Sequence, residues 1–303
     1  MLSFRRFTPE DRELFQNFLP YCAQRGCEYS FVNLNIWGNQ QFTLVRDFLV
    51  LFSQFDRFSI YPFPLGQGDP KPVLEAIMED AQQRGISCRI SSLTKSDCDL
   101  LEQLFPGQFC FHTDRDNYDY VYPVASLSTL SGKRYQSKRN FVNRFLANHP
   151  DHALLPLDDS THAAAQQCID RWFAQRQQTD PLADFHLEKK AICRAFAHRK
   201  ELGLEGLVLM EGGEALAVTM GSPLSENTFD IHFEKALEGI DGAYAVINQG
   251  FARYLQEKYP QLQYLNREDD LGIPGLRQAK LSYHPDHLVE KYWAKLREED
   301  DED

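Results

Sequence analysis

The order of helical and strand patterns in the second half of the chain restricts the fold more than any other feature of the sequence. Apolar residues recur at the spacing of buried helix faces in three segments, residues 161–178, 187–200 and 244–259. They alternate with other residues, as strands do, in segments 204–210, 215–221, 228–235 and 264–266. Two helices, a three-strand meander and further short elements predict an α+β fold with mainly antiparallel strands.

The first half contains the same kinds of element. Strand patterns occupy residues 41–55, 57–63, 86–90 and 119–124, and helical patterns occupy residues 71–84, a short stretch near 100–104, and the stretch after 132. Residues 151–159, with Pro156 among them, separate the halves. We therefore expect a domain over 1–155, a second over 156–297 and a solvated acidic tail over 298–303. The order of elements in the second domain is that of the GNAT acyltransferase fold.

Charge is distributed unevenly along the chain. Residues 1–150 are neutral, with 16 Lys and Arg and 16 acids, and the remainder carries the whole net charge of −12. A globally acidic protein is a poor general binder of nucleic acid, so any phosphate contact must come from a local basic patch. One patch stands out, because five cations fall within twelve residues: Lys133, Arg134, Lys138, Arg139 and Arg144. This run predicts a phosphate-binding surface, with a solvated helix face as the alternative.

The cysteines and the absence of long apolar segments bear on the compartment. The seven cysteines are scattered and form no Cys-x-x-Cys pair, which is typical of small buried thiols in a reducing environment. The N-terminal residues lack the apolar core of a secretion signal, and no segment approaches the roughly 18 apolar residues of a membrane span. We expect a cytoplasmic protein without a transmembrane segment.

Strand 228–235 is the first candidate site. Alternation over this strand predicts that Asp230, His232 and Glu234 share one face while the apolar residues between them face the core. Three titratable side chains in a row suit general acid–base chemistry, with His232 as a substrate-binding group. The alternative is an ordinary solvent-facing side of a sheet.

The segment 266–283 is the second candidate site. It follows a short strand and leads into a helix, and ligands of α/β folds tend to lie at such strand ends. Polar side chains that could bind substrate there are Asn266, Asp269, Arg277 and Tyr283. The alternative is a solvated loop in which Asp270 caps the helix.

Several common site motifs are absent. The sequence contains no Walker motif, no dinucleotide fingerprint and no Gly-x-Ser-x-Gly elbow. It also lacks the Gln/Arg-x-x-Gly-x-Gly/Ala turn that binds acyl-CoA, and Glu238 and Asp241 would repel a pyrophosphate at the corresponding turn. His284 and His287 have no third ligand nearby, so no metal site and no certain cofactor is predicted.

Three segments resemble a known family: residues 27–37 (CEYSFVNLNIW), residues 132–140 (GKRYQSKRN) and residues 266–283. The chain resembles an uncharacterised bacterial family related to the C-terminal domain of phosphatidylglycerol lysyltransferase. That family is similar to the Fem peptidyltransferases, which pack two GNAT-like domains in tandem. The resemblance covers nearly the whole chain and implies the same tandem fold here.

The resemblance also implies a catalytic residue. The Fem pattern Gly-Leu-x-x-Phe-Lys matches Gly275 to Lys280, with Ala279 in the place of Phe. It implies that Lys280 lies in the transfer site, and Asp230 or Glu234 is then the predicted proton acceptor. The implied reaction moves an aminoacyl group from charged tRNA to an amine or hydroxyl of a small molecule, peptide or lipid. The alternatives are an acyl-CoA-dependent N-acyltransferase and a non-catalytic binding protein on the same scaffold.

Overall fold

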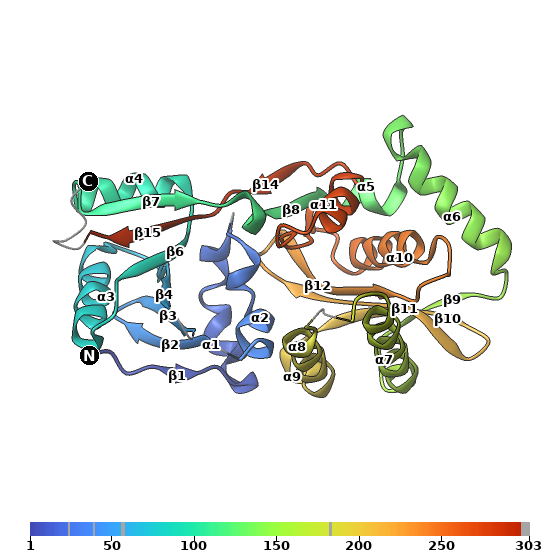
Figure 1. Cartoon of the computed structure of the whole chain (residues 1–303), viewed down its shortest axis with the longest axis horizontal. Coiled ribbons are helices and arrows are strands. Elements are labelled where there is room, and N and C mark those ends of the chain that lie inside the picture. The colour runs from blue at the N-terminus through green and yellow to red at the C-terminus, as the bar shows by residue number, and fades with distance from the viewer. Residues whose placement is uncertain (24, 39, 56–57, 182–183, 298–303) are drawn as a thin grey trace. The chain divides into compact units, whose positions relative to one another are not determined.

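The computed structural model describes residues 1–23, 25–38, 40–55, 58–181 and 184–297 (Figure 1). The predicted acidic tail, 298–303, lies outside the described residues. Two compact units are present. The first contains residues 1–119, 269–273 and 288 onward, and the second contains residues 120–268 and 274–287. The predicted domain boundary near residue 155 stays a prediction, and the contacts group residues 120–155 with the second unit.

The first unit is built on one sheet in the order β1-β2-β3-β4-β6-β15-β7, with β5 paired to β3. The strands are β1 (Arg5–Arg6), β2 (Gln40–Val45), β3 (Phe48–Gln54), β4 (Ser59–Pro62), β5 (Leu65–Gly66), β6 (Arg89–Leu93), β7 (Phe109–Thr113) and β15 (Tyr292–Leu296). The helices are α1 (Arg12–Gln16), α2 (Phe31–Ile36), α3 (Lys71–Arg84) and α4 (Lys95–Leu104). Strand β15 comes from the C-terminal end of the chain and pairs with both β6 and β7.

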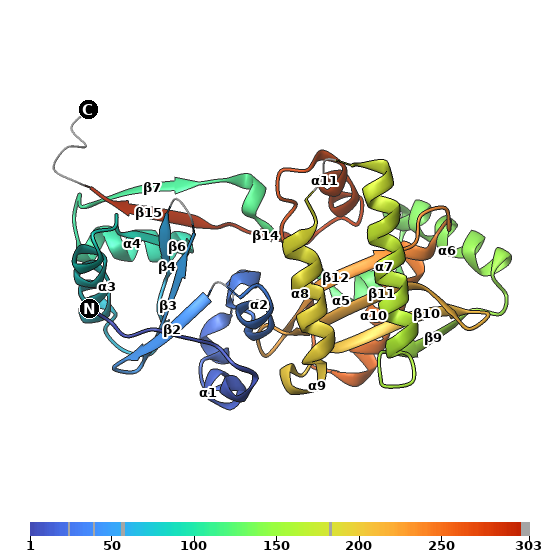
Figure 2. The same ribbon diagram turned by 60° about the horizontal axis from the view of Figure 1, so that its bottom comes forward.

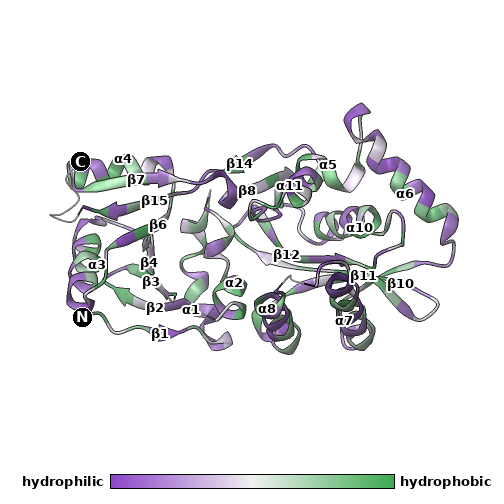
Figure 3. Cartoon of the chain, viewed as in Figure 1, coloured by the Kyte–Doolittle hydropathy of each residue, from purple (hydrophilic) through white to green (hydrophobic). Residues whose placement is uncertain are grey.

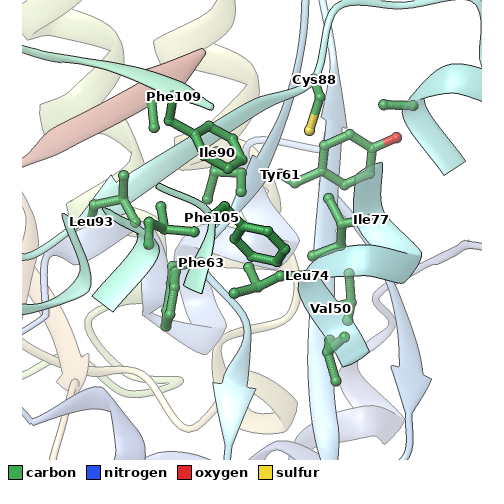
Figure 4. Packing of buried hydrophobic residues seen from close by; sticks show 14 of the residues in the cluster. Val50, Tyr61, Phe63, Leu74, Ile77, Cys88, Ile90, Leu93, Phe105 and Phe109 are labelled. Carbon is green, nitrogen blue, oxygen red and sulfur yellow. The ribbon is translucent and has the colours of Figure 1, made fainter. Parts of the chain in front are cut away.

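Aromatic and branched side chains fill the core of the first unit (Figure 4). Helix α3 begins with a proline in its first turn and ends at Gly85, whose φ of 67° terminates the helix. Its inward residues Leu74 and Ile77 are fully buried against strand residues such as Val50 and Tyr61. The apolar spacing that predicted this helix is therefore the spacing that forms the core.

The second unit is built on a sheet in the order β14-β8-β13-β12-β11-β10-β9. Its strands are β8 (Asp119–Pro123), β9 (Ala153–Pro156), β10 (Glu205–Glu211), β11 (Glu214–Pro223), β12 (Thr228–Ala236), β13 (Tyr264–Asn266) and β14 (His287–Val289). Helices α7 (His162–Thr179), α8 (His186–Ala197) and α9 (Arg199–Leu202) precede the meander β10–β12. The remaining helices are α5 (Val124–Thr129), α6 (Gln136–Asn148), α10 (Ala243–Lys258) and α11 (Pro274–Leu281).

Helices cover both faces of this second sheet. Figures 1 and 2 show α7 and α8 side by side on one face and α10 on the other. The expected order of helices and strands in the second half is confirmed, and the strands of both units are mainly antiparallel. Within the described residues, no helix is long and apolar enough to cross a membrane, and all seven cysteines are free thiols.

Strand β12 has an irregular centre. Met220 of β11 faces Phe233 and Gly221 faces Ile231, so His232 is one extra residue on β12, which makes a β-bulge. On the other side of β12, the parallel pairing with β13 covers only Thr228–Asp230 with Tyr264–Asn266. The bulge and the end of this pairing therefore fall at neighbouring points of the sheet, and the residues that follow β13 no longer pair with β12.

Gly221 makes the bulge possible. A Cβ atom at Gly221 would lie 2.3 Å from the carbonyl oxygen of Asp230 and 2.7 Å from the ring of Phe229. We expect Gly221→Ala to lower the free energy of unfolding by about 2 kcal/mol, because the backbone of β12 must move. Denaturant unfolding measures this change.

The control is Gly275→Ala in α11, where an added Cβ meets nothing within 4 Å. It should leave the stability unchanged or raise it slightly, because alanine favours helix. Equal losses in the two variants would contradict the role of the bulge.

Candidate active site

Three polar side chains meet at the bulge of β12. Ser222 Oγ of β11 lies 2.8 Å from His232 Nε2. On the other side of the ring, His232 Nδ1 lies 3.4 Å from Asp230 Oδ2 and 3.3 Å from Glu268 Oε1. Ser222, Asp230 and His232 are buried. His232 is the extra residue of the bulge, and its imidazole contacts both Ser222 on the neighbouring strand β11 and Glu268, which follows β13.

The hydrogen-bond directions follow from the two carboxylates. A ring nitrogen that faces two carboxylate oxygens carries the proton, so we assign the N–H to Nδ1 of His232. Nε2 then accepts a hydrogen bond from the hydroxyl of Ser222. The resulting chain of Ser222, His232 and Glu268 or Asp230 is a serine–imidazole–carboxylate arrangement, which can carry a proton between a hydroxyl and a carboxylate.

The predicted alternation along β12 is interrupted by this bulge. The sequence predicts Asp230, His232 and Glu234 on one face at strict period two, and the register shift at His232 breaks that period. The three side chains reach two adjoining clusters: Asp230 and His232 contact each other, while Glu234 belongs to the next cluster along β12.

The adjoining cluster is organised around Arg267. Its Nη2 donates to Glu234 Oε1 at 2.9 Å, and Asn248 Nδ2 of α10 donates to Glu234 Oε2 at 3.1 Å. The side chains of Arg267 and Glu234 are only 14% and 9% exposed, so this ion pair is largely shielded from water. Both carboxylate oxygens of Glu234 therefore accept a hydrogen bond.

Tyr283 lies between two cations. Lys138 Nζ of α6 is 4.0 Å from the centre of the Tyr283 ring, and the guanidinium of Arg267 is 4.9 Å from it. Burial raises the pKa of Tyr283 to about 12. Burial and the charge of Arg267 lower the pKa of Lys138 below its ordinary value. Lys138, one member of the basic run, thus contacts the same cluster as Tyr283 and Arg267 of segment 266–283.

Lys280 is a buried lysine on α11. It is 7% exposed, and its Nζ donates to the main-chain oxygen of Arg267 at 2.6 Å. The phenol of Tyr122 donates to the main-chain oxygen of Lys280 at 2.8 Å, and the ring of Tyr120 lies 5.7 Å from its Nζ. Strand β8 therefore holds α11 so that the ammonium lies beside Arg267.

The other predicted binding residues are dispersed. Asn266 is fully buried and accepts a hydrogen bond from the main-chain nitrogen of Glu268, which fixes the turn after β13. Asp269 belongs to the segment 269–273 that groups with the first unit, and Arg277 is half-buried on α11. Within the basic run, Lys133 and Arg134 are exposed, and Arg139 donates to the carbonyls of Leu130 and Gly132.

Among the residues that the structure describes, two clusters bring potential metal ligands within 4.8 Å of one another, Asp230–His232–Glu268 and Cys27–Glu28–Asp119. In the second, Lys291 Nζ of the first unit lies 2.6 Å from Asp119 Oδ1 and 2.7 Å from Glu28 Oε2, so one ammonium already forms ion pairs with both carboxylates.

Sequence reasoning missed Ser222 and Asn248 and gave Glu268 no role of its own. Glu268 comes directly after the polar residues Asn266 and Arg267 at the end of a short strand, and this position was a signal in the sequence for a site residue. Ser222 lies near the end of β11, 46 residues before Glu268. Asn248 lies on α10, 18 residues before Asn266. No local pattern relates them, because the pairing of β11, β12 and α10 brings them together.

These features define an α+β protein on the tandem GNAT fold, with a buried polar site at the bulge of one sheet. FemX, 10% identical, shares this fold with a TM-score of 0.61 over 98% of each chain. A tandem GNAT protein from the clavulanic acid biosynthesis pathway, 8% identical, gives a TM-score of 0.50 over 99% of this chain and 100% of the other. The expected fold class is confirmed.

A family model described as phosphatidylglycerol lysyltransferase, C-terminal, matches residues 20–295, and the chain belongs to this family of aminoacyltransferases. A conserved protein of unknown function from Bacteroides thetaiotaomicron is 37% identical, with a TM-score of 0.91 over 98% of this chain and 100% of that one. The structure of L-PGS from Bacillus licheniformis is 16% identical, with a TM-score of 0.67 over 96% and 93% of the two chains. The resemblance seen in the sequence is confirmed.

One curated relative is an uncharacterised protein of Mycoplasmoides gallisepticum, 24% identical over 182 residues. The match spans 59% of this chain and 56% of that protein. The chain therefore matches little more than half the length of this relative.

The buried ion pair in the site predicts a stability effect. We expect Glu234→Gln to lower the free energy of unfolding by about 3 kcal/mol, because it leaves the Arg267 guanidinium buried without a counter-charge. Denaturant unfolding at neutral pH measures the change.

The matched control is Glu214→Gln. Its partner Arg171 is 52% exposed and Glu214 is 68% exposed, so its loss should cost less than about 1 kcal/mol. A Glu234→Gln variant as stable as the control would show that the Arg267 site tolerates an unpaired charge.

Proposed function

We propose that this protein transfers an aminoacyl group from a charged tRNA to an amine or hydroxyl acceptor, with Lys280 at the reacting carbonyl. The observation that carries the proposal is a buried lysine on α11, at the Lys position of the Gly-Leu-x-x-x-Lys segment, in a chain of this family. An aminoacyl ester is already activated. The protein therefore needs to position the donor, exclude water and stabilise the charge that develops on the carbonyl oxygen.

Lys280 supplies the stabilising charge in this proposal. Its ammonium donates to the main-chain oxygen of Arg267, which holds the positive charge in place. A low-dielectric environment strengthens its interaction with an oxyanion. When the acceptor attacks the ester carbon, the oxyanion forms beside Lys280. The ester C–O bond then breaks, and the leaving tRNA oxygen takes up the proton that the acceptor gave up, so the tRNA leaves with a free hydroxyl.

The proton of the acceptor goes to the cluster at the bulge. Glu234 already accepts hydrogen bonds from Arg267 and Asn248 on its two oxygens. Glu234 is also ion-paired with Arg267, so the proposal assigns proton transfer to His232, which takes the proton on Nε2 in place of the hydrogen bond from Ser222. Asp230 and Glu268 face its Nδ1. Protonation of the imidazole there leaves a cation between two carboxylates, which stabilises it.

The turn before α10 favours tRNA over acyl-CoA as the donor. In an acyl-CoA enzyme, a pyrophosphate is well bound at a helix N-terminus. Here a Cβ at Gly242 would lie 2.4 Å from the main-chain oxygen of Phe141, so α6 covers the start of α10. Asp241 and Glu238 flank this turn and pair with Arg144 and Arg176. Two carboxylates and a covering carbonyl disfavour a pyrophosphate at this helix start.

The direct test is donor specificity. Purified protein is incubated with tRNA charged with a labelled amino-acid mixture, together with lipid, peptide and small-amine fractions, and the transferred label is followed. Transfer from charged tRNA, with weaker binding at high salt, supports the proposal. Protection of the protein against heat by acetyl-CoA, with no transfer from tRNA, would support an acyl-CoA-dependent enzyme instead. Absence of both would indicate a binding protein.

Lys280→Ala should lower the transfer rate about 100- to 1000-fold, the usual effect of losing one oxyanion donor. Lys280→Arg should restore little, since a planar guanidinium is wider than an ammonium. Single-turnover transfer measures the rate, and thermal unfolding reports on folding. If Lys280→Ala lowers the melting temperature and transfer persists, then Lys280 only anchors α11 to Arg267.

His232→Gln should lower the transfer rate about 100-fold or more, the range of general acid–base contributions. Ser222→Ala, which removes the hydroxyl bonded to Nε2, is the companion variant and should retain most of the rate. Single-turnover transfer measures both rates. A His232→Gln rate equal to that of the wild type would assign the proton to another group.

A further inference from the structure

A groove separate from the residues of the proposed transfer site lies between α6, α10 and β9 in the second unit. Its cavity volume is about 280 Å³, at the lower end of small-molecule sites. One part of its wall is apolar, from Val142 and Leu146 of α6, Leu154 of β9 and Val246 of α10. Figures 1 and 3 show α6 along this edge of the unit, with hydrophilic and hydrophobic residues interspersed.

The apolar part of the groove depends on a close approach of strand and helix. A Cβ at Gly250 of α10 would lie 2.6 Å from Leu154 Cδ1, so glycine at this position lets β9 lie against the helix. On the other wall, Leu146 remains 41% exposed although it faces an apolar neighbourhood. An apolar partner in the groove would remove this surface from water, which is favourable.

The polar part of the groove consists of two arginines fixed by one turn. Arg253 Nε donates to the main-chain oxygen of Ser128 at 2.8 Å. Arg139 Nη1 donates to the main-chain oxygens of Leu130 and Gly132, the latter at 2.7 Å, and its Nη2 donates to Gln136 Oε1 at 2.6 Å. Residues 128–132 therefore hold both guanidiniums in place before any ligand arrives.

Neither guanidinium has a carboxylate partner within 4.0 Å in the part of the chain that the structure describes, although the protein carries a net charge of −12. Arg144, on the same helix as Arg139, does pair with an acid, Asp241. Of five N–H donors on each guanidinium, Arg139 uses three and Arg253 uses one in these contacts. Donors remain on both side chains for an anion.

We propose that this groove binds a small organic oxyanion, a carboxylate or phosphate monoester that carries a short apolar group. The oxyanion accepts hydrogen bonds from Arg253 and Arg139. A guanidinium can bind either a planar carboxylate or a tetrahedral phosphate. The apolar group lies on Leu146, Leu154 and Val246. This goes beyond the proposed transfer reaction, because none of these residues belongs to the Lys280 and His232 clusters.

Isothermal titration of the full chain at low salt tests the proposal, with octanoate and octyl phosphate as probes and octylamine as the cationic control. We expect one or both anions to bind and octylamine not to bind. The preferred anion identifies the head group. Inorganic phosphate should bind more weakly than octyl phosphate, because it lacks the apolar contacts.

Two variants locate the site. Arg253→Gln should weaken anion binding about ten- to a hundredfold, the usual value of a charge-assisted hydrogen bond. Leu146→Ser should weaken the binding of octyl phosphate but not the binding of inorganic phosphate, because only the octyl group contacts Leu146. Arg144→Gln is the matched control on α6 and should bind as the wild type does.

The same titrations separate this proposal from the proposed transfer reaction, since Lys280→Ala should bind the probes normally. Failure of both anions to bind at millimolar concentration would overturn the proposal. Equal binding by Arg253→Gln and Arg144→Gln, with both variants folded by their melting temperatures, would also overturn it.

Discussion

The short parallel pairing of β12 with β13 is the constraint on which the rest of the site depends. Only three residues of each strand pair, and β12 carries an extra residue, His232, just beyond them. Continued pairing would satisfy the main-chain groups of the residues that follow and would confine their side chains to two alternating faces. Because pairing stops at Asp230 and Asn266, the side chains of Arg267 and Glu268 turn toward β12 and complete the two polar clusters.

Each unit takes one strand from a distant part of the sequence. Strand β15, near the C-terminal end, lies between β6 and β7 of the first unit, and β8 pairs with β13 in the second unit. Without β15, β6 and β7 would present unpaired edges, which fold poorly and aggregate. Strand β8 also supports the site, since the Tyr122 phenol bonds to the main chain of Lys280. The strand order thus ties the stability of each sheet to residues that lie far apart in the sequence.

The basic run shows how helical geometry divides a charge cluster. Successive residues of a helix point about 100° apart. Lys138 accordingly contacts Tyr283 in the proposed transfer site, while Arg139 donates to the main chain of the turn 130–132 and lines the groove beside α10. Arg144 pairs with Asp241 at the start of α10. The five cations of the run therefore lie in different surroundings, and phosphate binding by the run stays a prediction.

The sequence by itself determined the elements of the second unit, the α+β class and the family, because apolar spacing and turn residues act locally. It also indicated strand 228–235 and segment 266–283 as the places of the polar clusters. Only the tertiary structure decided that Ser222 and Asn248 join them, since β11 and α10 approach β12 through pairing and packing over long sequence distances. The bulge at His232 was likewise invisible to a period-two pattern, because an extra residue changes the register between strands and leaves the sequence of each strand unaltered.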